Sequence, residues 1–172
     1  MKKKKQRLII PFSGLKLGTH RFEFEIDPTF FEQFEYSIIQ DAEVNVEVDF
    51  VKKATLFEIE LAIDGIYHSA CDRCNDPLDI ILKGKEELIV KFGDGTYDET
   101  DEIKIIPHEA YELDLTNEIY QFIHLMLPNK VAHEDIDDCN PDVIQKLEEI
   151  NQGKEDKEEN IDPRWAALKK LK

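Results

Sequence analysis

The clearest pattern in the chain is an alternation of apolar and polar residues over positions 43–63. Every second residue is apolar in two successive runs: Val44, Val46, Val48 and Phe50, then Phe57, Ile59, Leu61 and Ile63. A period of two is typical of a half-buried β-strand. The pattern therefore predicts an antiparallel hairpin, and Gly65 is expected to mark a bulge in its second strand.

Shorter apolar runs predict further strands on both sides of this hairpin. They cover residues 8–12, 21–26, 78–82, 87–92 and 103–106. With the hairpin, they give six or seven strands.

Helical periodicity predicts three helices before the C-terminal motif. One has its apolar stripe at Leu115, Ile119, Phe122, Ile123 and Met126 and ends before Pro128. Another starts with Asn140 as N-cap and Pro141 at the first position, and Gly153 is expected to end it. The apolar face of this helix is formed by Val143, Ile144, Leu147 and Ile150. A short helix opening at Asp27-Pro28 has an apolar side formed by Phe30, Phe31, Phe34 and Ile38.

These elements predict a mixed α+β fold that is mostly antiparallel β. We expect a barrel-like or sandwich sheet with two packed helices and a short tethered C-terminal helix. The predicted organisation is a basic N-terminal arm over 1–7, a single globular domain over 8–153, a charged flexible linker over 154–161 and a C-terminal helical motif over 162–172.

The charge of the chain is strongly negative and unevenly distributed. The net charge is −16, although residues 1–7 carry +5 and residues 163–172 carry +4, so the residues between them carry −25. An acidic body repels nucleic acid, because neutralising phosphates requires clustered Lys and Arg. The composition therefore favours a basic protein as partner, and only the two basic ends are suited to binding RNA.

Cys71 and Cys74 form a C-x2-C pair at the expected end of a strand. Two thiolates at this spacing can bind one tetrahedral ion from a tight turn. His133 and Cys139, in the loop between two expected helices, would complete a Cys3His set, which suits zinc. Such a structural site would join the strand end to the helical region.

Three interpretations of these cysteines remain open. They form a structural zinc site, they pack or hydrogen-bond without metal, or they act as a redox or catalytic dithiol. The last lacks the strand-then-helix setting of thioredoxin-like proteins. Only the zinc site predicts that chelation lowers stability, because metal binding then contributes to folding.

Sequence motifs of catalysis are absent from the chain. No phosphate-binding loop, dinucleotide-binding glycine motif, zinc-protease helix motif or nucleophile elbow occurs. The sequence therefore favours a non-enzymatic protein with no small-molecule substrate. No apolar run approaches the roughly 18 residues of a membrane span, and three cysteines that include a C-x2-C favour a reducing cytoplasm.

The C-terminal motif contains the chain's only tryptophan. Asp162 and Pro163 are typical of a helix start, and Trp165, Leu168 and Leu171 form an apolar stripe. A helix of about ten residues is marginal alone in water. The stripe therefore needs a surface, either on its own domain or on a partner.

Four segments together resemble one family. They are Cys71-Asp72-Arg73-Cys74, the segment from Leu113-Asp114-Leu115 to Leu125-Met126-Leu127-Pro128, the loop from His133 to Cys139, and the closing block from Asp162 to Leu171. The chain is similar to the YceD family, also called domain of unknown function 177, over about residues 20–172. Asn129-Lys130 depart from the family pattern after Leu-Pro.

This resemblance implies a part in the accumulation or processing of 23S ribosomal RNA, without enzymatic activity. The family's cysteine and histidine positions correspond to Cys71, Cys74, His133 and Cys139. We therefore expect a cytoplasmic ribosome-biogenesis factor that contacts a ribosomal protein, an assembly factor or ribosomal RNA. The alternative is a zinc-stapled adaptor that docks its C-terminal helix into a partner groove. The candidate partner-binding residues are Pro163, Trp165, Leu168, Leu171 and Arg73.

Overall fold

The computed structural model describes residues 5–93 and 103–155, and the chain forms two compact units. The first unit comprises residues 1–69 and 77–131, and the second comprises residues 70–76 and 132–172. Helices α1 (Pro28–Phe31) and α2 (Thr116–Leu125) belong to the first unit, and helix α3 (Pro141–Glu155) belongs to the second. The single globular domain expected over residues 8–153 remains a prediction.

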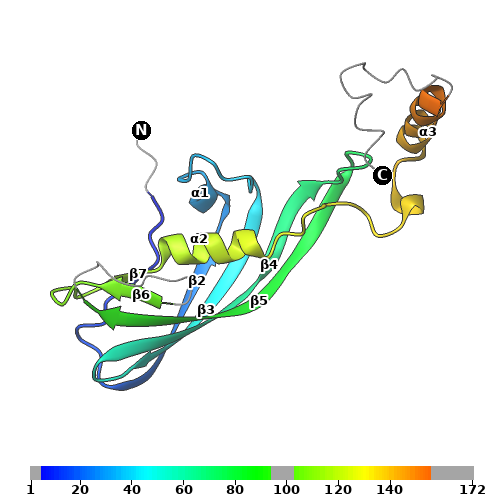
Figure 1. The fold of residues 1–172 in the computed structure, drawn as a ribbon. Coiled ribbons are helices and arrows are strands. Elements are labelled where there is room, and N and C mark those ends of the chain that lie inside the picture. Colours follow the sequence, from blue (N-terminus) through cyan, green and yellow to red (C-terminus); the bar gives the residue numbers. More distant parts are fainter. Residues whose placement is uncertain (1–4, 94–102, 156–172) are drawn as a thin grey trace, which may run out of the picture. The chain divides into compact units, whose positions relative to one another are not determined.

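A five-stranded sheet in the order β2-β3-β4-β5-β6 is the framework of the first unit (Figure 1). Its strands are β2 (Gly18–Ile26), β3 (Ala42–Lys52), β4 (Leu56–Ala70), β5 (Pro77–Phe92) and β6 (Ile103–Ile106). The sheet is open, with β2 and β6 at its edges, so it is not closed into a barrel. The predicted α+β class with mostly antiparallel strands is confirmed.

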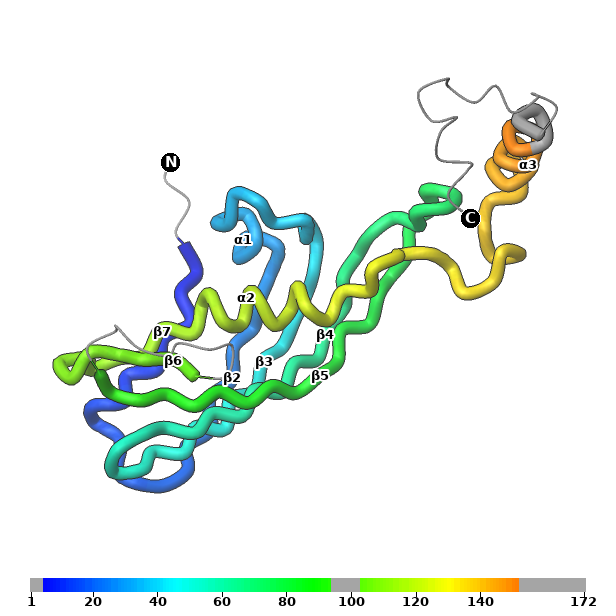
Figure 2. The backbone as a smooth tube through the Cα atoms, in the orientation of Figure 1, coloured from blue at the N-terminus to red at the C-terminus, as the bar shows by residue number. Residues whose placement is uncertain are grey.

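A second, two-stranded sheet ties the start of the first unit to its end. Strands β1 (Ile9–Ile10) and β7 (Leu113–Asp114) pair antiparallel, and the backbone trace shows them side by side (Figure 2). Leu115 N–H donates to the Leu8 carbonyl at 2.9 Å, which extends this contact to the start of α2. The sequence pattern began the apolar stripe of this helix at Leu115 and did not predict β7.

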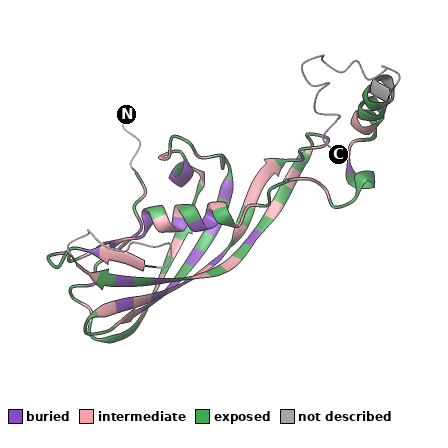
Figure 3. Ribbon diagram, viewed as in Figure 1, coloured by how far each residue is buried: buried purple, intermediate pink, exposed green. Residues whose placement is uncertain are grey.

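The hairpin of β3 and β4 follows the predicted alternation. Val46 lies opposite Ile63 and Val48 opposite Leu61, and all four side chains are buried. Buried residues therefore alternate with mostly exposed ones along β3 and with half-buried ones along the first half of β4 (Figure 3). The register continues through Gly65 without the predicted bulge. Gly65 is required for another reason, because a Cβ there would lie 2.4 Å from the Glu43 carbonyl oxygen.

Strand β5 corrects a second expectation. Residues 78–82 and 87–92 were predicted as separate strands, but β5 runs unbroken through Gly84. A Cβ on Gly84 would lie 2.6 Å from Cε of Met126, at the end of α2. The glycine thus permits close packing of a helix end on the strand, and it does not interrupt the strand.

The core lies between the apolar face of the sheet and α2. Ile119 and Ile123 of α2 are fully buried in one cluster with the apolar residues of β3 and β4. Helix α1 adds Phe30 and Phe31 to this core. The predicted apolar side of that helix was too long, because α1 ends at Phe31 and Ile38 is 66% exposed.

Helix α3 begins as predicted but differs from the prediction in its end and its burial. Asn140 Oδ1 accepts a hydrogen bond from Asp142 N–H at 3.1 Å, while the helix continues through Gly153 to Glu155. Leu147 and Ile150 are 39% and 56% exposed, whereas Val143 and Ile144 are half-buried, so the described residues cover only the first part of the apolar face that was expected to pack. The C-terminal motif over 162–172 lies outside the described residues, and no helix within them is long and apolar enough to cross a membrane.

Candidate metal centre and acidic sheet face

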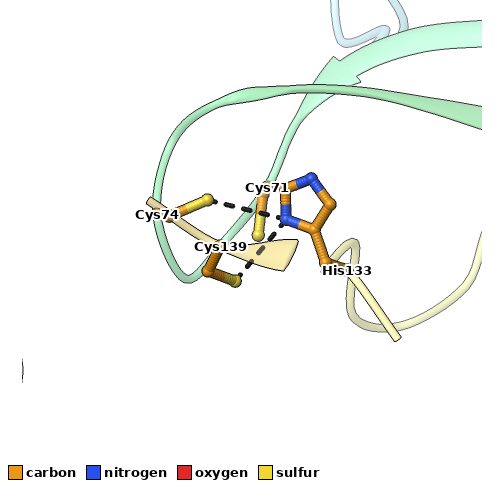
Figure 4. Close-up of side chains that lie close together, drawn as sticks. All are labelled: Cys71, Cys74, His133 and Cys139. Carbon is orange, nitrogen blue, oxygen red and sulfur yellow. Dashed lines mark hydrogen bonds between the residues drawn. The ribbon is translucent and has the colours of Figure 1, made fainter. Parts of the chain in front are cut away.

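A tight turn between β4 and β5 positions the first two cysteines. Cys71 N–H donates to the Asp76 carbonyl at 2.8 Å, and Asn75 N–H donates to the Cys71 carbonyl at 2.7 Å. Asn75 has a φ of 64°, in the left-handed region that asparagine tolerates better than most residues. The turn thereby brings the thiols of Cys71 and Cys74 to the same side of the backbone (Figure 4).

The segment before α3 supplies the other two side chains. It contains a short 3-10 turn over Ile136–Asp138, and Cys139 N–H donates to the Ile136 carbonyl at 3.0 Å. His133 lies before this turn and Cys139 directly after it. Both segments belong to the second unit, so the cluster lies within one compact part of the chain.

The four predicted ligands converge on one point. His133 Nδ1 lies 3.6 Å from Cys74 Sγ and 3.5 Å from Cys139 Sγ, and all four ligand atoms lie within 4.8 Å of one another (Figure 4). A tetrahedral zinc ion with ordinary Zn–S and Zn–N bonds places sulfur and nitrogen about 3.6 Å apart. These two S–N distances therefore fit a zinc tetrahedron.

The cysteines are buried, and none forms a disulfide. Cys71, Cys74 and Cys139 are 2%, 4% and 4% exposed. Burial raises the pKa of the Cys71 thiol, but the backbone N–H groups of His133, Cys74 and Arg73 outweigh it and lower this pKa to about 6. Burial raises the pKa of Cys139, and the thiols of Cys74 and Cys71 raise it further against an opposing hydrogen bond from Arg73.

This donor set fits a structural role better than a catalytic one. Three thiolates and one imidazole fill the four positions of a tetrahedral ion, whereas catalytic zinc keeps one position open for water or substrate. Binding through Nδ1 leaves the ring proton of His133 on Nε2. The arrangement is compatible with a metal that joins the C-x2-C turn to the segment before α3.

Sequence reasoning placed Arg73 among partner-binding residues and missed its contact inside the cluster. Arg73 Nη1 lies 3.3 Å from Cys139 Sγ and 3.5 Å from the Asp135 carbonyl oxygen. The position of Arg73 between the two cysteines was the signal that could have indicated this contact.

A second feature that the sequence pattern did not locate is the exposed face of the sheet. There Glu23 of β2 lies directly opposite Glu47 of β3, and Glu25 and Glu43 are their neighbours on the same face. We call Glu23, Glu25, Glu43 and Glu47 the acidic patch. Like charges directly opposite each other destabilise a sheet, so the Glu23–Glu47 pair by itself is unfavourable.

The patch glutamates form no ion pair with described residues, although Arg21 attracts Glu23 and Glu47 and Lys85 attracts Glu47. Several other acids on this face are paired: Asp49 with Arg21, Asp64 with Lys83, and Glu60 with Lys85. None of the four patch carboxylates has such a partner among the described residues. Two open hollows of about 540 and 610 Å3 adjoin the patch, and Glu25 and Asn45 line both.

Comparison with known proteins identifies the family. The family model described as "Large ribosomal RNA subunit accumulation protein YceD" matches residues 59–172, about two thirds of the chain. The chain belongs to the YceD family. No curated protein and no solved structure matches it.

The YceD match contains the whole candidate metal centre and the closing block over 162–171. It starts within β4, so the resemblance extends less far toward the N-terminus than the expected residue 20. Strands β2 and β3, which carry the acidic patch, lie outside the matched range.

Proposed function

We propose that this YceD-family chain is a non-enzymatic ribosome-biogenesis factor that supports accumulation of the large-subunit (23S) ribosomal RNA by binding a basic ribosomal protein. The family description supports the ribosomal role. This role implies a cytoplasmic site of action, where ribosomes assemble and thiols remain reduced.

The observation that carries the proposed partner class is the acidic patch. Glu23 and Glu47 face each other across two strands, and neither forms an ion pair with a described residue. Free ribosomal proteins are rich in Lys and Arg, and complementary charge both orients such partners and speeds their association. The same charge repels RNA phosphates. Binding of RNA is therefore left to the basic ends of the chain.

Complementation of a strain that lacks the gene tests this function. The variant Glu23→Gln/Glu47→Gln removes two patch charges, and the control Glu109→Gln/Glu148→Gln removes two exposed charges elsewhere. We expect the patch variant to restore less 23S rRNA, relative to 16S, than the control. Full restoration by both variants would contradict a role of the acidic patch in this function. Normal 23S rRNA levels in the deletion strain would contradict the proposed function itself.

We also propose that the Cys3His cluster binds one structural zinc ion. Its support is the convergence of Cys71, Cys74, His133 and Cys139 with S–N distances suited to zinc. Elemental analysis of protein purified without added metal should give about one zinc per chain, lost in Cys139→Ser. Metal-free wild-type protein would contradict this proposal and leave the cysteines as packing residues.

An adaptor that binds its partner through Pro163, Trp165, Leu168 and Leu171 remains a second proposal. The exposed apolar side chains Leu147 and Ile150 of α3 offer the same motif a surface within its own chain. The two arrangements differ in what truncation of the motif does to folding.

A further inference from the structure

Arg73 contacts both halves of the cysteine cluster. Its backbone N–H donates to Cys71 Sγ at 3.4 Å, within its own turn. Its guanidinium Nη1 lies 3.3 Å from Cys139 Sγ and 3.5 Å from the Asp135 carbonyl oxygen, both in the segment before α3. One half-buried side chain thus bridges the two segments that supply the four ligand atoms.

We propose that Arg73 is the positioning and charge-balancing residue of the metal centre, an inference that rests on the proposed zinc site. Zinc with three thiolates and a neutral imidazole carries a net charge of −1. A guanidinium that donates an N–H to one thiolate cancels this charge through a charge-assisted hydrogen bond. Arg73 also orients Cys139, because the same guanidinium nitrogen reaches the Asp135 carbonyl in the backbone that leads to it.

Arg73 is the only Lys or Arg in the two segments that form the metal centre. Within these segments, residues 70–76 and 132–139, six residues are Asp or Glu. An anionic zinc centre in such surroundings has no other cation within these segments to offset its charge. Removal of the guanidinium therefore leaves the bound state less favourable, although all four ligand residues are still present.

The expected effect is a loss of metal affinity of about 10–100-fold, the range typical of changes to groups that hydrogen-bond metal ligands. Arg73→Gln removes the charge. Arg73→Lys keeps the charge but replaces the planar fork, so its affinity should lie between that of Arg73→Gln and that of the wild type. The matched control is Arg21→Gln, which removes an exposed arginine that bonds Asp49 on the sheet.

The experiment measures zinc affinity of the full chain by competition with a chromophoric chelator, and the absorption spectrum after substitution by Co2+. Loss of an N–H···S bond raises the energy of the sulfur lone pairs. The thiolate-to-cobalt charge-transfer band should therefore move to longer wavelength in Arg73→Gln and less so in Arg73→Lys. A side chain that only supports folding would leave the band in place.

The outcomes separate this inference from the zinc proposal. If the wild type binds no metal, both the zinc site and the role of Arg73 are overturned. If it binds zinc and Arg73→Gln stays within about twofold of the Arg21→Gln control, the role of Arg73 is overturned while the zinc site stands. An unmoved cobalt band, or equal affinities for the Lys and Gln variants, would likewise overturn it. Should Arg73→Gln fail to fold, the band of Arg73→Lys decides alone: a shift supports the role and an unmoved band overturns it.

Discussion

Replacing Glu47 by Gln is expected to stabilise the protein, although it removes a charged side chain from a regular strand. Glu47 lies directly opposite Glu23 in the β2–β3 register. Directly opposed side chains are about 5 Å apart at Cβ, and two charges about 6 Å apart in water repel by about 0.7 kcal/mol. This value lies within the range of about 0.2–1 kcal/mol found for cross-strand pairs.

The matched control is Asp49→Asn, two residues along the same face of the same strand. Asp49 accepts two hydrogen bonds from Arg21, at 2.8 and 3.1 Å, and this bonding lowers the pKa of its carboxyl group. Its replacement removes the same charge but breaks a favourable pair. The two variants should therefore change stability in opposite directions.

Thermal unfolding at low and high salt measures both effects. For a chain of this length, about 0.7 kcal/mol raises Tm by about 2 °C, and about 1 M salt should abolish the gain because it screens charges beyond about 3 Å. A Glu47→Gln variant that is less stable than the wild type would refute the reasoning. So would a gain that is the same at both salt concentrations.

Three further predictions concern other parts of the chain. A zinc chelator should speed amide hydrogen exchange in residues 71–76 and 136–144 but not in β3, because only the second unit contains the proposed metal site. Equal exchange rates with and without the chelator would contradict this prediction. Deleting residues 156–172 should lower Tm if the C-terminal motif covers Leu147 and Ile150 of α3, whereas unchanged folding with lost partner binding would favour the adaptor. The hydrogen bond of His68 to Asp79 raises the pKa of His68 above 6.5, so its stabilisation is present at low pH and is lost as pH rises through the raised value. The free energy of unfolding should accordingly change less between about pH 6 and about pH 8 in His68→Gln than in the wild type. An identical change in both proteins would contradict this role of His68.

The hairpin and the grouping of the four Cys and His side chains were predictable because each has a strong local signal. Alternation over 43–63 marks one buried face, and a one-residue slip of the register would expose all of it. Cys71 and Cys74 lie three positions apart, and few cysteines and histidines elsewhere could complete their set. Cys139 could therefore be assigned to the same cluster as Cys74 because the chain has few other cysteines and histidines, although the two residues are far apart in sequence.

The pairings that were missed depend on contacts between distant residues. Strands β1 and β7 contain two residues each, too few to show a period, and they meet only because the chain returns past its own start. Gly84 resembles an interruption in sequence, and only the position of Met126 shows that it serves packing. The acidic patch depends on which glutamates face each other, which the register of β2 and β3 determines.

The most direct test of the proposed function compares binding of the purified chain to large-subunit ribosomal proteins with its binding to 23S rRNA. Both are measured at about 0.15 M salt, because exposed charges farther apart than about 8 Å are then largely screened. We predict saturable binding to a basic ribosomal protein that Glu23→Gln/Glu47→Gln weakens and Glu109→Gln/Glu148→Gln does not. Binding to the rRNA that persists at this salt, together with ribosomal-protein binding that is absent or indifferent to the patch variant, would contradict the account.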